Sequence, residues 1–199
     1  MHPNPVFRGQ SAAANLAFAR ERGFGVLAVT VEGAPLLSHI PFVMPSDDLV
    51  EAHLVRSNPI ARALLTAPLP ARLAIQGPEG YISPDWYGLE DQVPTWNYVA
   101  VHLTGRLEAR PAEELRAHLD RLSAAFEARL APKPPWLVSK MPEELLARMM
   151  RQIVPVRLAV EDVDGTWKLG QNKPEPARLA AAEAVGGEIG ALMRELPEG

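Results

Sequence analysis

The segment from Arg56 to Pro59 has the residue types that bind a phosphate group. Asn58 followed by Pro59 is typical of the first residues of a helix, whose free backbone N–H groups and positive dipole end attract anions. The guanidinium of Arg56, just before that helix, can add a bidentate charged contact. The alternative is that Asn58 only caps the helix and Arg56 is solvated. On the residues alone, the segment is therefore a candidate phosphate site with this alternative open.

A second candidate binding site is a segment rich in Trp and Tyr, followed by residues that alternate between apolar and polar or aromatic. Two of the four Trp and all three Tyr lie within residues 81–98. From residue 96 onward the period of two predicts a β-strand, with a Val/Leu face that enters a core. The opposite face is aromatic and polar, which suits a stacked planar ligand or a subunit interface, although a second core layer is the alternative. The first face carries Asn97, Val99, Val101 and Leu103, and the second carries Trp96, Tyr98, His102 and Thr104.

Five blocks of the sequence, taken together, resemble the signature of the PaiB family. They are Ser38–Phe42, His53–Pro59, Gly80–Tyr87, Val93–His102 and Lys168–Lys173. Members of that family are FMN-binding negative transcriptional regulators built on a split β-barrel. The resemblance implies one FMN-binding split-barrel domain over residues 1–199, of class α+β and mainly antiparallel β, with peripheral helices.

The resemblance also implies which residues bind FMN. In split-barrel flavoproteins the strand-to-helix turn holds the flavin phosphate, which assigns Arg56 to that role. An exposed Trp would offer stacking area to the isoalloxazine ring, and an Asn amide would match its alternating donors and acceptors. The block at 171–173 would form a polar recognition patch, with an ordinary exposed loop as the alternative. The predicted cofactor-binding residues are Ser38, His39, His53, Arg56, Ser57, Asn58, Thr95, Trp96, Asn97, Gln171, Asn172 and Lys173.

The composition argues against several kinds of site and partner. Cysteine is absent, so no disulfide or thiolate metal site can form, and the histidines lack a flanking carboxylate motif, so we expect no metal. The net charge is −4 and no basic stripe is visible, which argues against direct DNA binding. No apolar run approaches the ~20 residues that span a bilayer, and the first residues are unlike a signal peptide. We therefore expect a cytoplasmic protein without membrane contact.

Patterns along the chain predict the elements that would carry these residues. Ser11 and Gly23 are typical of the start and end of a first helix, and the pairs at 32–33 and 164–165 predict hairpin turns. Strands joined by short turns, with helices between and after them, favour an antiparallel barrel with peripheral helices. Helical segments are expected at about 111–130, 142–151 and 176–195.

The residues show no constellation for catalysis without a cofactor. There is no recognisable Ser–His–Asp or Cys–His set, no P-loop, and no G-x-G-x-x-G after a strand. We interpret the chain as an FMN-binding homodimer of PaiB type, a transcriptional regulator or redox sensor. The alternative is an FMN-dependent oxidoreductase, flavin reductase-like or haem-handling, in which the flavin does the chemistry. A third possibility, a barrel that has lost FMN, is disfavoured by the polar candidate residues.

Overall fold

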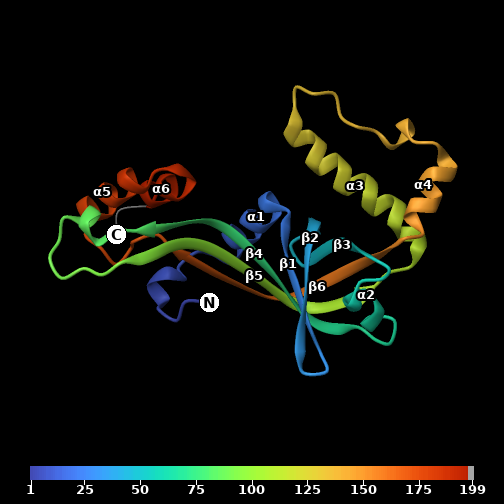
Figure 1. Cartoon of the computed structure of the whole chain (residues 1–199), viewed down its shortest axis with the longest axis horizontal. Helices are drawn as coiled ribbons and strands as arrows, with labels where there is room; N and C mark the ends of the chain where they lie inside the picture. The colour runs from blue at the N-terminus through green and yellow to red at the C-terminus, as the bar shows by residue number, and fades with distance from the viewer. Residues whose placement is uncertain (197–199) are drawn as a thin grey trace. The chain divides into compact units, whose positions relative to one another are not determined.

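The computed structural model describes residues 1–196, and Figure 1 shows the order of its elements. Within these residues the strands are β1 (Phe24–Val31), β2 (Ala34–Ser46), β3 (Leu49–Val55), β4 (Leu69–Ile82), β5 (Thr95–Ala109) and β6 (Ile153–Lys168). The α-helices are α1 (Ala12–Arg22), α2 (Pro59–Ala63), α3 (Leu115–Glu127), α4 (Glu143–Met150), α5 (Glu175–Val185) and α6 (Gly187–Arg194). Short 3₁₀ helices are η1 (Pro5–Phe7), η2 (Pro84–Tyr87), η3 (Ala112–Glu114), η4 (Ala128–Leu130) and η5 (Val138–Lys140).

The chain folds into two compact units. Unit 1 contains Met1–Phe18, Ile75–His102 and the chain from Val163 onward, and unit 2 contains Ala19–Ala74 and Leu103–Asp162. No helix among residues 1–196 is long and apolar enough to cross a membrane. The structure does not test whether residues 1–199 form one domain, and that expectation stays a prediction.

The strands form a six-strand sheet, and its mainly antiparallel character is as the sequence predicts. Their order is β1-β2-β3-β6-β5-β4, and the order closes on itself because β1 also pairs with β4. In β1 and β2 the register runs from Phe24 opposite Pro41 to Val31 opposite Ala34. The turn between them is the predicted one at Glu32 and Gly33. Both residues have positive φ, as in the two-residue turns whose twist matches a hairpin.

Unit 2 has its core inside the sheet and a second layer under α3. The side chains that alternate inward include Leu27 and Val29 of β1, which are 1% and 2% exposed. From the other side, α3 contacts β2 and β3 and buries Leu115, His118 and Leu122 at helical spacing. Because α3 covers β3, that strand is buried on both faces for part of its length.

Unit 1 has a separate core in which small helical residues pack against strand residues. The helices α5 and α6 meet at Gly186, whose positive φ of 62° is readily adopted only by glycine. Alanines on α5 allow close packing on the larger apolar side chains. The buried cluster is Ile82, Tyr87, Val99, Leu169, Ala177, Ala181, Ala182, Ile189 and Met193.

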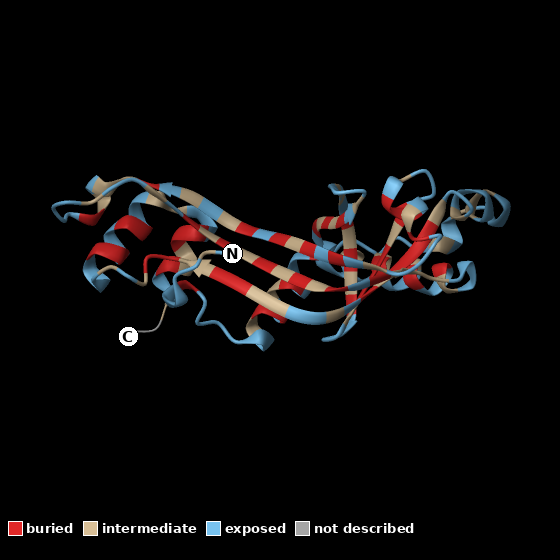
Figure 2. Ribbon diagram, turned by 90° about the horizontal axis from the view of Figure 1, so that it is seen from below, coloured by how far each residue is buried: buried red, intermediate tan, exposed pale blue. Residues whose placement is uncertain are grey.

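Burial along β5 follows the predicted period of two. Val99, Val101 and Leu103 are 0% exposed, whereas Trp96 is 55% exposed. Bands of buried and less buried residues alternate along the strands in Figure 2. The predicted assignment of the Val/Leu face to a core is therefore confirmed.

The predicted hairpin at 164–165 is wrong, because β6 runs unbroken through these residues. A Cβ on Gly165 would overlap the side-chain amide of Asn15, which comes from α1. The same Asn15 oxygen accepts a hydrogen bond of 2.8 Å from Trp167 Nε1. A glycine is thus required at position 165 because the side chain of Asn15 approaches the strand closely there, and not because the chain turns.

Gly105 offers a direct test of the contact between β5 and β6 in unit 2. A Cβ at this position would overlap the backbone carbonyl of Ala159, which cannot move without shifting β6. We expect Gly105→Ala to lower the free energy of unfolding by about 2–4 kcal/mol, measured by urea denaturation. Gly9→Ala is the matched control, because a Cβ there meets no atom within 4 Å. Equal unfolding midpoints for the two variants would contradict this packing.

Candidate functional site

The turn between β3 and α2 in unit 2 is held by the side chain of Asn58. Its Oδ1 accepts a hydrogen bond of 2.9 Å from the backbone N–H of Ile60, so the predicted N-cap is confirmed. Its Nδ2 donates to Ser38 Oγ on β2 at 3.1 Å. The amide of Asn58 therefore has a structural role, and it fixes Ser38 beside the turn.

Arg56 brings a positive charge to this turn. Its Nε donates to the backbone oxygen of Arg151 at 3.0 Å, and its Nη2 donates to that of Ile153 at 3.3 Å. Among residues 1–196 no carboxylate lies within 4 Å of its guanidinium, and the side chain is exposed. These two carbonyls orient the guanidinium and leave further N–H groups for an anion. Because α2 has only five residues, Arg56 rather than a helix dipole is the main attraction for a phosphate.

The other predicted residues of unit 2 differ in exposure. His39 and Ser57 are exposed, and neither is buried against other side chains. His53 instead lies against α3, where its Nδ1 is 3.1 Å from Nε2 of His118. His39 and Ser57 can therefore reach a ligand from solvent, whereas the ring of His53 is already paired.

In unit 1 the predicted triplet at the start of β5 divides between two faces. Trp96 is exposed and its ring centre lies 6.3 Å from that of Tyr81, at an interplanar angle of 76°. Asn97 is 1% exposed and donates from Nδ2 to Met193 Sδ at 3.3 Å, while its Oδ1 has no hydrogen-bond partner. Thr95 accepts a hydrogen bond from Lys168 Nζ. Trp96 and Tyr81 thus offer an aromatic surface, and Asn97 belongs to the core.

The block at 171–173 forms a tight turn after β6. Gln171 accepts from the backbone N–H of Leu169 at 2.8 Å and donates to the backbone oxygen of Trp167. Gly170 has a φ of 87°, a conformation that strains other residues. Asn172 is exposed, and Lys173 donates to Gln92 Oε1. The side chain of Gln171 therefore closes its own turn, which leaves Asn172 and Lys173 as the groups able to face a ligand.

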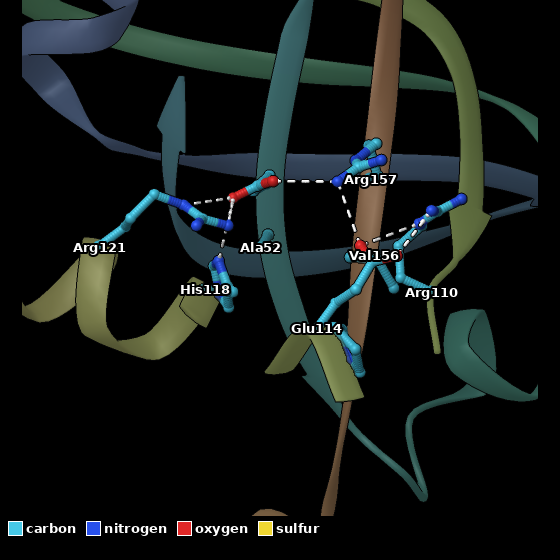
Figure 3. A pocket seen from close by; sticks show the side chains of 9 residues that line it. Ala52, Arg110, Glu114, His118, Arg121, Val156 and Arg157 are labelled. Carbon is cyan, nitrogen blue, oxygen red and sulfur yellow. Dashed lines mark hydrogen bonds and ion pairs between the residues drawn. The ribbon is translucent and has the colours of Figure 1, made fainter. Parts of the chain in front are cut away.

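The sequence did not predict the charged cluster under α3, which Figure 3 shows. Glu51 of β3 is only 6% exposed, and its carboxylate binds Arg121 at 2.6 Å and Arg157 at 3.2 Å. Arg157 also reaches Glu114 at 3.1 Å, and Glu114 binds Arg110 at 2.7 Å. Charges of opposite sign alternate through the cluster, so it neutralises itself and ties α3 to β3 and β6. Its only signal in the sequence is a Glu on the apolar strand β3.

His118 lies at the edge of this cluster in a position that disfavours its charged form. Burial, and next the neighbouring His53, lower the pKa of His118 to about 4, against the opposite effect of Glu51. Burial also lowers the pKa of His53. His118 Nδ1 has no hydrogen-bond partner and is 3.9 Å from Glu51 Oε2. At neutral pH the two rings are therefore a neutral pair, in which one N–H donates to the other ring.

The exposed charged and aromatic groups of each unit indicate what that unit could bind. Within residues 1–196, no three His, Asp or Glu side chains are grouped to hold a metal ion. Unit 2 offers an exposed guanidinium, and unit 1 offers an exposed Trp–Tyr surface together with the ammonium groups of Lys168 and Lys173. Cations and aromatic faces fit a planar ring system that carries a phosphate. Each unit by itself therefore has groups that suit part of such a ligand: an exposed cation in unit 2, and an aromatic surface with two ammonium groups in unit 1.

Comparison with protein families gives a match over most of the chain. Residues 1–162 match the sequence model of a family described as "Putative FMN-binding domain". The protein named "Protease synthase and sporulation protein PAI 2" of Bacillus subtilis is 30% identical over 184 residues, which cover 91% of this chain and 87% of that protein. An uncharacterized protein of Aspergillus fumigatus is 30% identical over 227 residues and covers 87% of each chain.

Solved structures share the fold at low sequence identity. The FAD and heme binding protein of Mycobacterium smegmatis has a TM-score of 0.59 and 18% identity, over 82% of this chain and 74% of that one. A conserved hypothetical protein of Mycobacterium tuberculosis has a TM-score of 0.58 and 17% identity, over 84% and 91%. At these identities the likeness concerns the fold alone.

The pKa of His118 predicts how stability depends on pH. An unfolded chain binds a proton at this ring below about pH 6.5, whereas the folded chain resists it down to about pH 4. The free energy of unfolding should therefore fall as the pH drops from 6.5 to 4, by up to about 3 kcal/mol from this group. Urea midpoints measured over this range should fall less steeply for His118→Gln than for the wild type. The control is His39→Gln, which replaces an exposed ring and should keep the wild-type dependence of the urea midpoint on pH. If the midpoint of His118→Gln depends on pH as steeply as that of the wild type, the assignment to His118 is contradicted.

Proposed function

This chain belongs to the family of FMN-binding domains that residues 1–162 match, and from that membership we propose that it is an FMN-binding regulator or redox sensor of PaiB type. The family match is the observation that carries the proposal. The Bacillus subtilis relative is named "Protease synthase and sporulation protein PAI 2", and its name is consistent with a regulatory role. The sheet is then a split β-barrel of the FMN-binding kind, and both units belong to one domain over residues 1–199.

The proposed phosphate contact is Arg56. Its guanidinium is exposed, oriented by two backbone carbonyls and free of any carboxylate partner among residues 1–196. Ser57 and His39 are exposed, and Ser38 and Asn58 hold the turn in place. A charge-assisted hydrogen bond to phosphate is roughly twice as strong as a neutral one, so Arg56 contributes most of the affinity at this end of the ligand.

For unit 1, taken by itself, we propose that the exposed groups form a surface that suits a flavin ring. Trp96 offers a stacking face, and Asn172 and Lys173 offer an amide and an ammonium. FMN, when bound, would supply the redox chemistry, and these side chains would bind and orient it. The remaining predicted contacts rest on the resemblance alone, because their side chains are engaged within the protein: Thr95 with Lys168, Gln171 with its own turn, Asn97 with Met193 and His53 with His118.

The chain acts as a homodimer in this proposal. In the hairpin of β1 and β2, the side chains of Phe24 and Leu37 are 52% and 61% exposed. Leaving apolar side chains in water costs free energy, and a homodimer would bury them. Two-fold association of such a surface is the commonest solution in oligomers. The cytoplasmic location stays a prediction. Steady NAD(P)H oxidation by the FMN-loaded protein would favour the oxidoreductase alternative over a regulator.

The phosphate contact can be tested by replacing Arg56. We expect Arg56→Ala to weaken FMN binding in isothermal titration by about 1.5–3 kcal/mol, because a charged hydrogen bond to phosphate is lost. Arg56→Lys should recover part of the affinity. Arg62→Ala is the matched control, since Arg62 is an exposed arginine on α2. FMN affinity in Arg56→Ala equal to that of the control would remove Arg56 from the site.

Light scattering tests the assembly. With FMN present at micromolar protein, the mass should be twice the 21.7 kDa of one chain. Leu37→Glu should reduce this mass, because it puts a charge on the exposed hairpin face. Leu130→Glu, which changes an exposed Leu of η4, should not. A monomeric mass for the wild type would refute the homodimer.

A further inference from the structure

Two of the four lysines of this chain lie in unit 1, at the end of β6 and in the turn that follows it. Lys168 ends β6 and Lys173 follows it by five residues, whereas Lys133 and Lys140 belong to unit 2. Both side chains in unit 1 are half-buried. A lysine that only serves solubility would extend into water, so these two positions need another explanation.

Each of the two ammonium groups contacts neutral groups. Lys168 Nζ donates to Thr95 Oγ1 and lies 5.9 Å from the centre of the Phe7 ring. Lys173 Nζ donates to Gln92 Oε1 and lies 5.0 Å from the centre of the Tyr87 ring. An ammonium has three donors, so each retains N–H groups for another acceptor. Hydroxyl, amide and aromatic contacts orient the charges without neutralising them.

The acids near these lysines in sequence are already engaged. Asp164 binds Arg8 at 2.7 Å, and Glu175 binds Arg178 at 3.4 Å. Within the described part of the chain, no carboxylate lies within 4 Å of either lysine of unit 1. Lys133 of unit 2, in contrast, is paired with Glu127. Among residues 1–196, the two half-buried charges of unit 1 therefore have no carboxylate beside them.

This arrangement has a cost that an anion would remove. Burial, and next the positive charge of Lys173, hold the pKa of Lys168 below its usual value. Two cations that are close enough to affect each other, in partly desolvated positions, repel one another. An oxyanion that accepts hydrogen bonds from both would replace this repulsion by attraction.

We propose that Lys168 and Lys173, oriented by Thr95 and Gln92, form an anion-binding site in unit 1 that takes the phosphate or carboxylate group of a small molecule. The site is separate from the proposed phosphate contact of Arg56, which belongs to unit 2. It does not require that FMN binds there. The anionic group has two possible sources. It belongs to a second small molecule if the phosphate of FMN lies at Arg56, or it is the phosphate of FMN itself, in which case Arg56 is not the phosphate contact.

Lysine-selective NMR on the full chain tests the proposal, because ¹³Cε labelling gives only four lysine signals. Inorganic phosphate, added at constant ionic strength, should shift the signals of Lys168 and Lys173 saturably and raise the pKa of Lys168 by roughly half a unit or more. Lys133 and Lys140 report screening alone and should not saturate. Four signals that respond alike, or none that saturates, would overturn the proposal.

Three variants show whether the charge of Lys168 is responsible. Lys168→Met should weaken phosphate binding by about tenfold or more, and Lys168→Arg should retain it, which also controls for folding. Lys140→Met, at an exposed lysine of unit 2, should bind as the wild type does. Wild-type phosphate affinity in a folded Lys168→Met, or loss of binding in a folded Lys168→Arg, would refute the assignment.

Titrations with FMN and riboflavin distinguish the two sources of the anion. If FMN supplies it, FMN but not riboflavin shifts the two lysines, and Lys168→Met loses FMN affinity in step with phosphate affinity. If a second molecule supplies it, Lys168→Met keeps wild-type FMN affinity and loses phosphate alone. Both results support the site. A wild type that binds phosphate at the lysines but never binds FMN would refute the proposed function and leave this inference standing.

Discussion

The exposed aromatic surface of unit 1 depends on the pleat of β5. Successive residues of a strand point to opposite faces, so burying Val99 and Val101 in a core forces Trp96 outward and Asn97 inward. The exposed Trp96 then meets Tyr81 across the surface of unit 1. A shift of one residue in the register of β5 would exchange these faces and bury the aromatic surface.

The two units differ in whether their buried or half-buried charges have a partner of opposite sign. In unit 2 the carboxylate of the buried Glu51 is matched by two guanidinium groups, those of Arg121 and Arg157. In unit 1 the cations Lys168 and Lys173 have no acid beside them among the described residues. The first arrangement stabilises a helix on a sheet, and the second is suited to a ligand that brings its own negative charge.

Local signals in the sequence predicted much of this fold. The turn at Glu32 and Gly33 and the cap at Asn58 depend on residues next to each other in the chain, and both are confirmed. The period of two in β5 is likewise visible without its partners. The mainly antiparallel character of the sheet follows from the same kind of pattern.

The features that the sequence did not predict depend on residues far apart in the chain. The sequence predicts a turn at Gly165, and only the structure shows that Asn15 packs against this glycine. The pairing of His53 with His118 of α3 is likewise visible only in the structure. Asn97 lies on the face of β5 that the sequence assigns to the core, but its contact with Met193 of α6 is visible only in the structure. Lys168 could not be singled out, because only the structure shows that no carboxylate of residues 1–196 lies within 4 Å of it.

The central claim is that this chain binds a phosphorylated flavin, and a parallel titration with FMN and riboflavin tests it most directly. The two ligands share the isoalloxazine ring, and only FMN carries a phosphate for the cationic groups of this protein. The account predicts saturable quenching of FMN fluorescence at one FMN per chain, with riboflavin about tenfold weaker or more. Equal affinity for the two ligands, or no saturable binding of FMN, would contradict it.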